Sequence, residues 1–194
     1  KETSDFIRSL HISNGVNIKE AVGLGKLEIA DDKVLSASLT DGSDINVDFI
    51  IVGIGITPNT ELAEGANLKI NNGIFINDKC QTSVSNIYAA GDCTSFEYKD
   101  TLVRLESVGN AIDQATIVAQ NIMKQNTNYI PKPWFWSDQY DLKLQIAGLN
   151  TGYNEVVVRK GESKQVSHWY YKGESLLAVD ALNDPRCYMI GKRL

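Results

Sequence analysis

The sequence has 194 residues, of which 43% are hydrophobic and 22% charged, with a formal net charge of −5 at pH 7. A chain of this length can bury one large or two small cores, and the composition is that of an ordinary globular protein. The acidic balance gives no electrostatic support for nucleic-acid binding, and no apolar run reaches membrane-spanning length. We therefore expect a globular protein that binds neither nucleic acid nor membranes, whose oligomeric state the sequence leaves open.

The first sixty residues predict the second half of a nucleotide-binding domain. A helical pattern begins at once at Lys1, and the first methionine is Met123, so we expect the chain to be a piece of a longer protein. Alternating residues predict a hairpin, and a nearly continuous apolar run predicts a strand that is covered on both faces. In chain order the expected elements are a helix over 3–14 and strands over 16–19, 26–30, 34–40 and 45–54.

The last of these strands ends in the glycine-rich segment 53–59, which contains Gly53, Gly55 and Pro58. Two glycines at a strand end allow a cofactor to approach the backbone closely, while proline stiffens the exit. A plain crossover between two domains is the alternative interpretation. No G-x-G-x-x-G dinucleotide fingerprint occurs in the chain, so it contains no phosphate-binding loop of that kind.

A turn at Thr82 leads into a short apolar strand expected over 87–90, which is followed at once by Gly91 and Asp92. Ligands of open α/β sheets bind beyond the carboxyl ends of strands. Gly91 leaves the backbone accessible there, and the Asp92 carboxylate can accept hydrogen bonds from hydroxyl groups. A simple strand-to-loop turn remains the alternative for the Gly-Asp pair alone. After Asp92 we expect a loop that contains Phe96 and Tyr98.

A helix is expected to start after Ser107, a suitable N-cap, and to run to about Met123. The start of a helix offers free N–H groups and the positive end of the helix dipole. Both suit the edge of a ligand ring that gains negative charge. A plain amphipathic core helix is the alternative. The apolar residues expected to form its packed face are Ala111, Ala115, Val118, Ala119 and Ile122.

Prolines at 131 and 133 mark a boundary before the aromatic segment Trp134-Phe135-Trp136. We expect Trp134 and Phe135 to belong to the core of a small module. The three cysteines, Cys80, Cys93 and Cys187, form neither a C-x-x-C pair nor a metal-binding cluster, and we expect reduced, buried thiols in a cytoplasmic protein. Further expected elements are strands over 142–147, 155–159, 166–171 and 175–181 and a last helix that begins at Pro185.

Three motifs in this order, Arg104-Leu105-Glu106-Ser107-Val108, residues 134–140 and Leu177-Ala178-Val179-Asp180, resemble the ferredoxin reductases of the putidaredoxin reductase and rhodocoxin reductase type. The resemblance covers essentially the whole chain as the C-terminal half of such an enzyme. It implies an α/β fold: the second half of a two-dinucleotide-binding-domain flavoprotein followed by a C-terminal α+β module. The implied parts are the end of the NAD(H)-binding domain over 1–60, the returning segment of the FAD-binding domain over 61–129, and a truncated reductase module over 130–194.

The resemblance further implies electron transfer from NADH through FAD to a [2Fe–2S] ferredoxin that serves an oxygenase or a cytochrome P450. It assigns Asp92, after Gly91, to the ribityl chain of FAD, the Val108 backbone to the flavin ring, and Gly55 to a place beside the nicotinamide. Trp136 is expected beside the flavin and the ferredoxin, with Arg159, Lys160 and Lys164 as a basic docking cluster. This chain alone is expected to be inactive. An NADH oxidase or disulfide reductase of the same superfamily, and a non-catalytic interaction module, are the alternatives.

Overall fold

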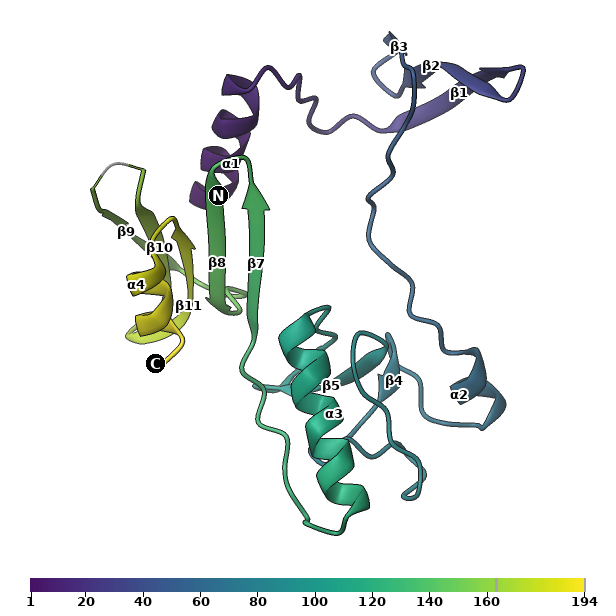
Figure 1. The fold of residues 1–194 in the computed structure, drawn as a ribbon, viewed down its shortest axis with the longest axis vertical. Helices are drawn as coiled ribbons and strands as arrows, with labels where there is room; N and C mark the ends of the chain where they lie inside the picture. The colour runs from purple at the N-terminus through teal and green to yellow at the C-terminus, as the bar shows by residue number, and fades with distance from the viewer. Residues whose placement is uncertain (163, 194) are drawn as a thin grey trace. The chain divides into compact units, whose positions relative to one another are not determined.

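The computed structural model describes residues 1–162 and 164–193, so that Leu194, the expected end of the C-terminal module, lies outside the described residues. The chain divides into two compact units, residues 1–56 and 57–194. Figure 1 shows their helices and strands, most of which are labelled. The finer three-part division at residues 60 and 129 stays a prediction.

The first unit consists of one helix and a small antiparallel sheet. Helix α1 spans Glu2–Ser13, and strands β1 (Leu24–Ala30), β2 (Lys33–Leu39) and β3 (Asp44–Asn46) pair in the order β1-β2-β3. Asp31 and Asp32 adopt φ values of 49° and 58°, which give the tight turn of the β1–β2 hairpin its required twist. The predicted helix and hairpin are confirmed. The predicted strand over 16–19 is wrong, since that segment has no strand structure.

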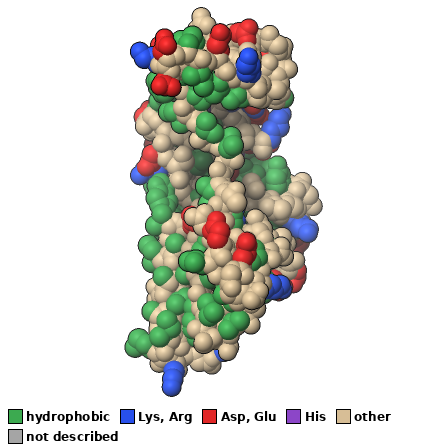
Figure 2. All heavy atoms as spheres, turned by 90° about the vertical axis from the view of Figure 1, so that its right-hand side faces the viewer, with side chains coloured by type: hydrophobic (Ala, Val, Ile, Leu, Met, Phe, Trp, Pro, Cys, Tyr) green, Lys and Arg blue, Asp and Glu red, His purple; other side chains and the backbone are tan. Residues whose placement is uncertain are grey.

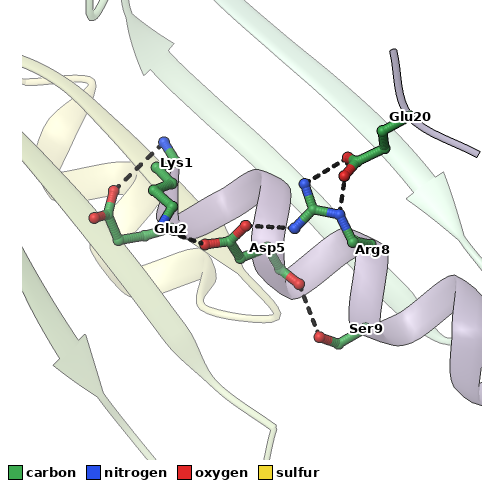
Figure 3. A network of polar contacts seen from close by, with 6 residues as sticks. All are labelled: Lys1, Glu2, Asp5, Arg8, Ser9 and Glu20. Carbon is green, nitrogen blue, oxygen red and sulfur yellow. Dashed lines mark hydrogen bonds and ion pairs between the residues drawn. The ribbon is translucent and has the colours of Figure 1, made fainter. Parts of the chain in front are cut away.

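An ion-pair network ties α1 to the segment that follows it (Figure 3). Arg8 donates from Nε and Nη2 to Oε1 of Glu20, over 2.9 and 2.6 Å, and also pairs with Asp5 one turn earlier on the helix. Lys1 completes the network, with its Nζ 3.8 Å from Asp5 Oδ2. These groups are largely exposed, so solvent screens the pairs and each adds little to stability.

The apolar run over 45–54 does not form the long covered strand that was expected. Only Asp44–Asn46 is a strand, and beyond it Val47 donates one hydrogen bond, of 3.1 Å, to the Leu35 carbonyl. Phe49, Ile51 and Ile54 are strongly exposed, Ile54 to 90%. A covered strand needs neighbouring strands and layers on both faces. The described residues of the first unit provide neither beside this run, and the prediction is therefore wrong for this structure.

The second unit begins with a small sheet and a long helix. Strands β4 (Ile74–Phe75), β5 (Thr94–Tyr98) and β6 (Thr101–Val103) form a sheet in which β4 and β5 are parallel. Helix α2 (Glu61–Gly65) precedes this sheet, and α3 (Val108–Ile122) follows it. Their core contains Ile76, Cys80, Phe96, Leu105 and Tyr129.

Two sequence predictions differ from this part of the structure. The β5–β6 hairpin lies where a loop was expected, with Lys99 and Asp100 at positive φ in its turn. Residues 87–90 form no strand, and only an isolated bridge joins Tyr88 to Gln81. A strand needs a neighbour with which to exchange backbone hydrogen bonds, and none of the described residues pairs with 87–90 beyond that bridge.

Helix α3 buries a polar face, and of the predicted apolar face only Ala111 and Val118 are half-buried, with Val118 packed against the core. Gly109, Asn110, Gln114 and Asn121 are buried, whereas Ala115, Ala119 and Ile122 are exposed. The buried amides hold neighbouring segments: Asn110 binds the Leu105 carbonyl and the Tyr129 hydroxyl, and Asn121 binds the backbone at Lys79 and Thr127. Buried amides are stable when they are hydrogen-bonded in this way.

The last part of the second unit is a five-stranded antiparallel sheet with the order β7-β8-β11-β10-β9 and one helix, α4 (Pro185–Gly191). Asp184 caps α4 by accepting a hydrogen bond from the Cys187 N–H, 3.0 Å away. The four predicted strands and the last helix are confirmed, and β7 is an additional strand. The strands are β7 (Trp134–Gln139), β8 (Leu142–Gly148), β9 (Glu155–Lys160), β10 (Val166–Lys172) and β11 (Ser175–Leu182).

Candidate functional site

The turn that starts at Gly91 is held from inside by Gln114. Gly91 has φ +88°, in the left-handed region that favours glycine, and its N–H donates to Gln114 Oε1 over 2.7 Å. The Thr94 hydroxyl lies 2.8 Å from the Gly91 carbonyl and 2.9 Å from the same Gln114 oxygen. Thr94 and Gln114 are both fully buried. The turn is therefore anchored directly to helix α3.

This turn presents Asp92 at the surface. The residue is exposed, and its carboxylate has no hydrogen-bond partner among the described residues. A carboxylate in this state can accept hydrogen bonds from the hydroxyl groups of a ligand.

The start of α3 forms the second part of the site. Ser107 caps the helix, with its Oγ 3.5 Å from the Asn110 N–H, as the sequence predicted. Val108 is 55% exposed, and the N–H groups of Val108 and Gly109 have no intrahelical acceptor. Together with the helix dipole, they favour negative charge at this point.

The aromatic strand β7 packs against this helix start. The Ser107 hydroxyl donates to the Trp134 carbonyl over 3.1 Å. A Cβ atom on Gly109 would lie only 2.3 Å from Trp134 Nε1, so a glycine is needed for the indole to fit. These contacts fix the position of Trp136, two residues further along the strand.

Val108 and Trp136 line one small pocket of about 170 Å³, together with Glu106, Ser107 and Phe135. Trp136 is 48% exposed and stacks on Trp134, with ring centroids 5.4 Å apart and planes 24° apart. Trp134 packs against the core residues Ala147, Ala181 and Tyr188, and Phe135 packs against the core next to α3. The predicted role of Trp134 in the core of the small module is confirmed, whereas Phe135 packs on the neighbouring core beside α3.

An ion pair joins Asp92 to this pocket. Arg104 Nη1 lies 2.7 Å from Glu106 Oε1 and 3.4 Å from the Asp92 carbonyl oxygen. The sequence analysis assigned no role to Arg104, Glu106 or Gln114. Arg104 and Glu106 stand on either side of the buried Leu105, and in an extended segment such i, i+2 residues share one side. That alternation is the signal that could have identified them.

Four of the five predicted cofactor-binding residues, Gly91, Asp92, Val108 and Trp136, lie in the second unit. Gly55 lies in the first unit, with φ +92° and open space around the position of a Cβ. Its place beside a nicotinamide stays a prediction, as do the binding roles of the other four.

The three cysteines are free thiols, of which Cys80 and Cys187 are buried and Cys93 is half-buried. Burial raises the pKa of Cys80 to about 12, helped by the nearby Asp78 carboxylate. Burial also raises the pKa of Cys187. In the part of the chain that the structure describes, no group of His, Cys, Asp and Glu side chains could hold a metal ion, and no helix is both long and apolar enough to cross a membrane.

The residues at this site fit one end of a flavin cofactor. Asp92 offers a free acceptor for a polyhydroxyl chain, and the α3 start offers N–H groups to a ring edge that becomes more negative on reduction. Trp136 provides an aromatic surface beside the helix start. No glycine-rich phosphate loop occurs in the sequence, so this fit extends to one end of the cofactor alone.

Comparison with known proteins identifies the family of the chain. Residues 1–115 match the family model of the pyridine nucleotide-disulphide oxidoreductases, and residues 134–194 match the C-terminal reductase model. The chain belongs to the pyridine nucleotide-disulphide oxidoreductase family. It is 38% identical to rhodocoxin reductase of Rhodococcus erythropolis over 98% of this chain and 45% of that protein. It is 40% identical to putidaredoxin reductase of Pseudomonas putida over 94% of this chain and 44% of that protein.

Solved structures give the same result. The ferredoxin reductase for the CYP199A2 system of Rhodopseudomonas palustris superposes with a TM-score of 0.95 at 34% identity, covering 100% of this chain and 48% of that one. The reductase of the covalent putidaredoxin reductase–putidaredoxin complex gives 0.93 at 38% identity, covering 98% and 47%. The chain thus spans about half the length of these relatives. The expected α/β fold class and the resemblance to ferredoxin reductases are confirmed.

Proposed function

We propose that residues 1–194 work as the C-terminal half of an FAD-dependent NAD(P)H:ferredoxin oxidoreductase. Electrons would pass from NADH through FAD to a [2Fe–2S] ferredoxin that serves an oxygenase or a cytochrome P450. The observation that carries the proposal is the connection of Asp92 to the Val108–Trp136 pocket through Arg104 and Glu106. When bound, FAD would supply two-electron uptake and one-electron release.

Within this proposal, the parts of the chain have separate tasks. Residues 1–60 would contribute to the NAD(H)-binding domain, with Gly55 beside the nicotinamide. Residues 61–129 would hold the ribityl chain through Asp92 and orient the flavin ring at the Val108 backbone. Residues 130–194 would cover the flavin and form the surface that meets the ferredoxin. We further propose a cytoplasmic location, since free thiols persist in reducing compartments.

We propose Trp136 as the centre of the docking surface. It is exposed, and it stacks on Trp134, over whose ring Lys192 Nζ lies 4.5 Å from the centroid. An aromatic anchor beside a cation suits a small, transient complex with an acidic protein.

Two residues of the basic cluster expected at this surface, Arg159 and Lys160, end β9, whereas Trp136 is on β7 at the opposite edge of the sheet. The third, Lys164, lies in the turn after β9 and pairs with Asp141 in the β7–β8 turn. Four strand spacings of about 4.8 Å separate the two edges by roughly 19 Å. Lys192 therefore replaces that cluster as the cation nearest to the aromatic stack in our proposal.

The disulfide-reductase alternative finds less support. Cys80 is fully buried and its pKa is raised to about 12, so very little thiolate forms near neutral pH. The pKa of the buried Cys187 is raised as well. The thiol chemistry of a disulfide reductase needs an accessible thiolate with a partner, which favours the ferredoxin reductase.

The test uses the full-length protein that contains this chain. We expect it to purify with FAD, to reduce ferricyanide with NADH, and to reduce a [2Fe–2S] ferredoxin faster than it reduces oxygen or disulfides. Asp92→Ala should lower the FAD content, whereas the same change at the exposed Asp138 of β7 should not. A protein without bound FAD, or one that reduces a disulfide substrate in preference to ferredoxin, would refute the proposal.

A further inference from the structure

The charge of Arg104 is buried without enough partners to explain its burial. Its side chain is only 11% exposed, and its stem packs so tightly on Gly73 that a Cβ there would lie 3.2 Å from Arg104 Cδ. Nε is buried and has no hydrogen-bond partner among the described residues. Burying a guanidinium costs free energy that a structural role would recover through a full set of hydrogen bonds.

The single ion pair of Arg104 offsets little of this cost. Its partner Glu106 is 42% exposed, and an ion pair that reaches into water is weakened by solvent. The remaining Nη1 contact, to the Asp92 carbonyl, is long at 3.4 Å. A contribution to stability alone therefore does not explain the Arg104–Glu106 ion pair.

The position of the pair suggests a different role. Arg104 contacts the backbone of Asp92, and Glu106 lines the pocket with Val108 and Trp136. A flavin held by Asp92 and Val108 would lie next to both charges. Charges near a redox group favour one oxidation state over another, and their effect is strong where water is excluded.

We infer that Arg104 and Glu106 are a charged pair that sets the reduction potential of the bound flavin, an inference that rests on the proposed function. The reduced ring is more negative than the oxidised one. The guanidinium would therefore stabilise the reduced form and raise the potential. The Glu106 carboxylate would act in the opposite direction and moderate that effect. The two residues act through their charges and their positions, and neither exchanges electrons itself.

The test is a potentiometric titration of flavin in the full-length protein and in matched variants. Arg104→Gln should lower the midpoint potential, and Glu106→Gln should raise it. The double variant, which keeps the net charge, should fall between the two, and Arg104→Lys should stay near the wild type. Lys164→Gln removes an equal charge at an exposed site in the β9–β10 turn and should leave the potential unchanged.

The outcomes separate this inference from the proposed function. Wild-type protein without FAD would refute both. Flavin-loaded variants whose potentials do not move, or move in the same direction for Arg104→Gln and Glu106→Gln, would refute the inference alone. If Arg104→Gln fails to retain FAD, the titrations of Glu106→Gln and Arg104→Lys still test the inference, because each variant keeps a cation at position 104.

Discussion

Gln114 in the middle of α3 accepts a hydrogen bond from the Gly91 backbone N–H over 2.7 Å, although the two residues are far apart in the sequence. The same oxygen lies 2.9 Å from the Thr94 hydroxyl, and all three groups are buried. One side-chain oxygen thereby joins the Gly91 turn to the helix whose start forms the other half of the candidate site. The geometry of Asp92 relative to Val108 depends on this contact.

Replacing Gln114 by leucine should destabilise the second unit and loosen the Asp92 turn. The change leaves the Gly91 N–H without its acceptor in a buried position, which costs about 1–3 kcal/mol. Thermal unfolding should show a melting temperature lower by about 2–4 °C per kcal/mol. Gln125→Leu, at an exposed position after the same helix, is the control and should change it little. Equal melting temperatures for both variants would contradict the proposed anchoring.

Gly109→Ala should disrupt the contact between α3 and β7. The added methyl group would lie 2.3 Å from Trp134 Nε1, which is closer than two non-bonded heavy atoms can approach. The indole or the helix must therefore move. Overpacking of this kind costs about 1–3 kcal/mol, and Trp134 fluorescence should change with it. Gly65→Ala is the matched control, because a Cβ there meets no atom within 4 Å. A normal melting temperature and emission spectrum for Gly109→Ala would show that the two elements are not in contact as described.

The sequence predicted elements well where local pattern determines structure. Alternation and turn residues located the hairpin at Asp31–Asp32 and the strands of the last module. Ser107 and Pro185 marked helix starts, because a capping hydrogen bond and the fixed φ of proline are local. The polar face of α3 could not be predicted in the same way. Gln114 and Asn121 bind backbone groups of distant loops, and Asn110 binds the nearby Leu105 carbonyl and the distant Tyr129 hydroxyl. The hydrophobicity pattern of the helix does not indicate such partners.

The candidate site shows the same contrast. Gly91 and Asp92 can be recognised from the local sequence. The Arg104–Glu106 pair becomes part of a site only because β7 packs beside the start of α3. The apolar run over 45–54 led to a wrong prediction, that of a long strand. Its residues favour a strand, but pairing depends on neighbours that no local pattern reveals.

Stability of the second unit should fall above pH 9 partly because of Cys80. Burial raises its pKa in the folded state from the ordinary value of 9.0 to about 12. Between these values the unfolded chain loses the thiol proton while the folded chain keeps it, so the free energy of unfolding declines as pH rises. Cys80→Ala should flatten this decline in denaturant titrations, and Cys93→Ala, at a half-buried thiol, should not. Parallel alkaline profiles for wild type and Cys80→Ala would contradict the raised pKa.

The 194-residue chain alone should bind FAD weakly. Asp92 and the α3 start can contact one end of the cofactor, but the sequence contains no glycine-rich loop for the pyrophosphate. Charge-assisted hydrogen bonds of the kind such a loop provides are worth about 1.5–3 kcal/mol each. Titration followed by flavin fluorescence should show no micromolar quenching. Tight binding would mean that other residues of this chain hold the phosphates of FAD.

In the full-length protein, Trp136→Ala should slow ferredoxin reduction by about tenfold or more while leaving ferricyanide reduction nearly unchanged, if the proposed function holds. The first reaction needs a protein surface, and an exposed aromatic side chain at its centre is the kind of residue that contributes most to binding. The second reaction uses a small oxidant that needs no such surface. Both rates are measured with NADH at saturation, after the FAD content of each variant has been matched.

Two controls locate the docking surface on the sheet. Val158→Ala removes a similarly exposed apolar side chain from β9, at the opposite edge from Trp136, and should leave ferredoxin reduction unchanged. Lys192→Gln should weaken the salt dependence of the rate, because exposed charges are screened as the Debye length falls from about 10 Å at 0.1 M to about 3 Å at 1 M. If Trp136→Ala slows both acceptors equally, the residue supports the flavin pocket and the ferredoxin binds elsewhere. If Val158→Ala has the larger effect, the surface lies at the β9 edge, with Arg159 and Lys160.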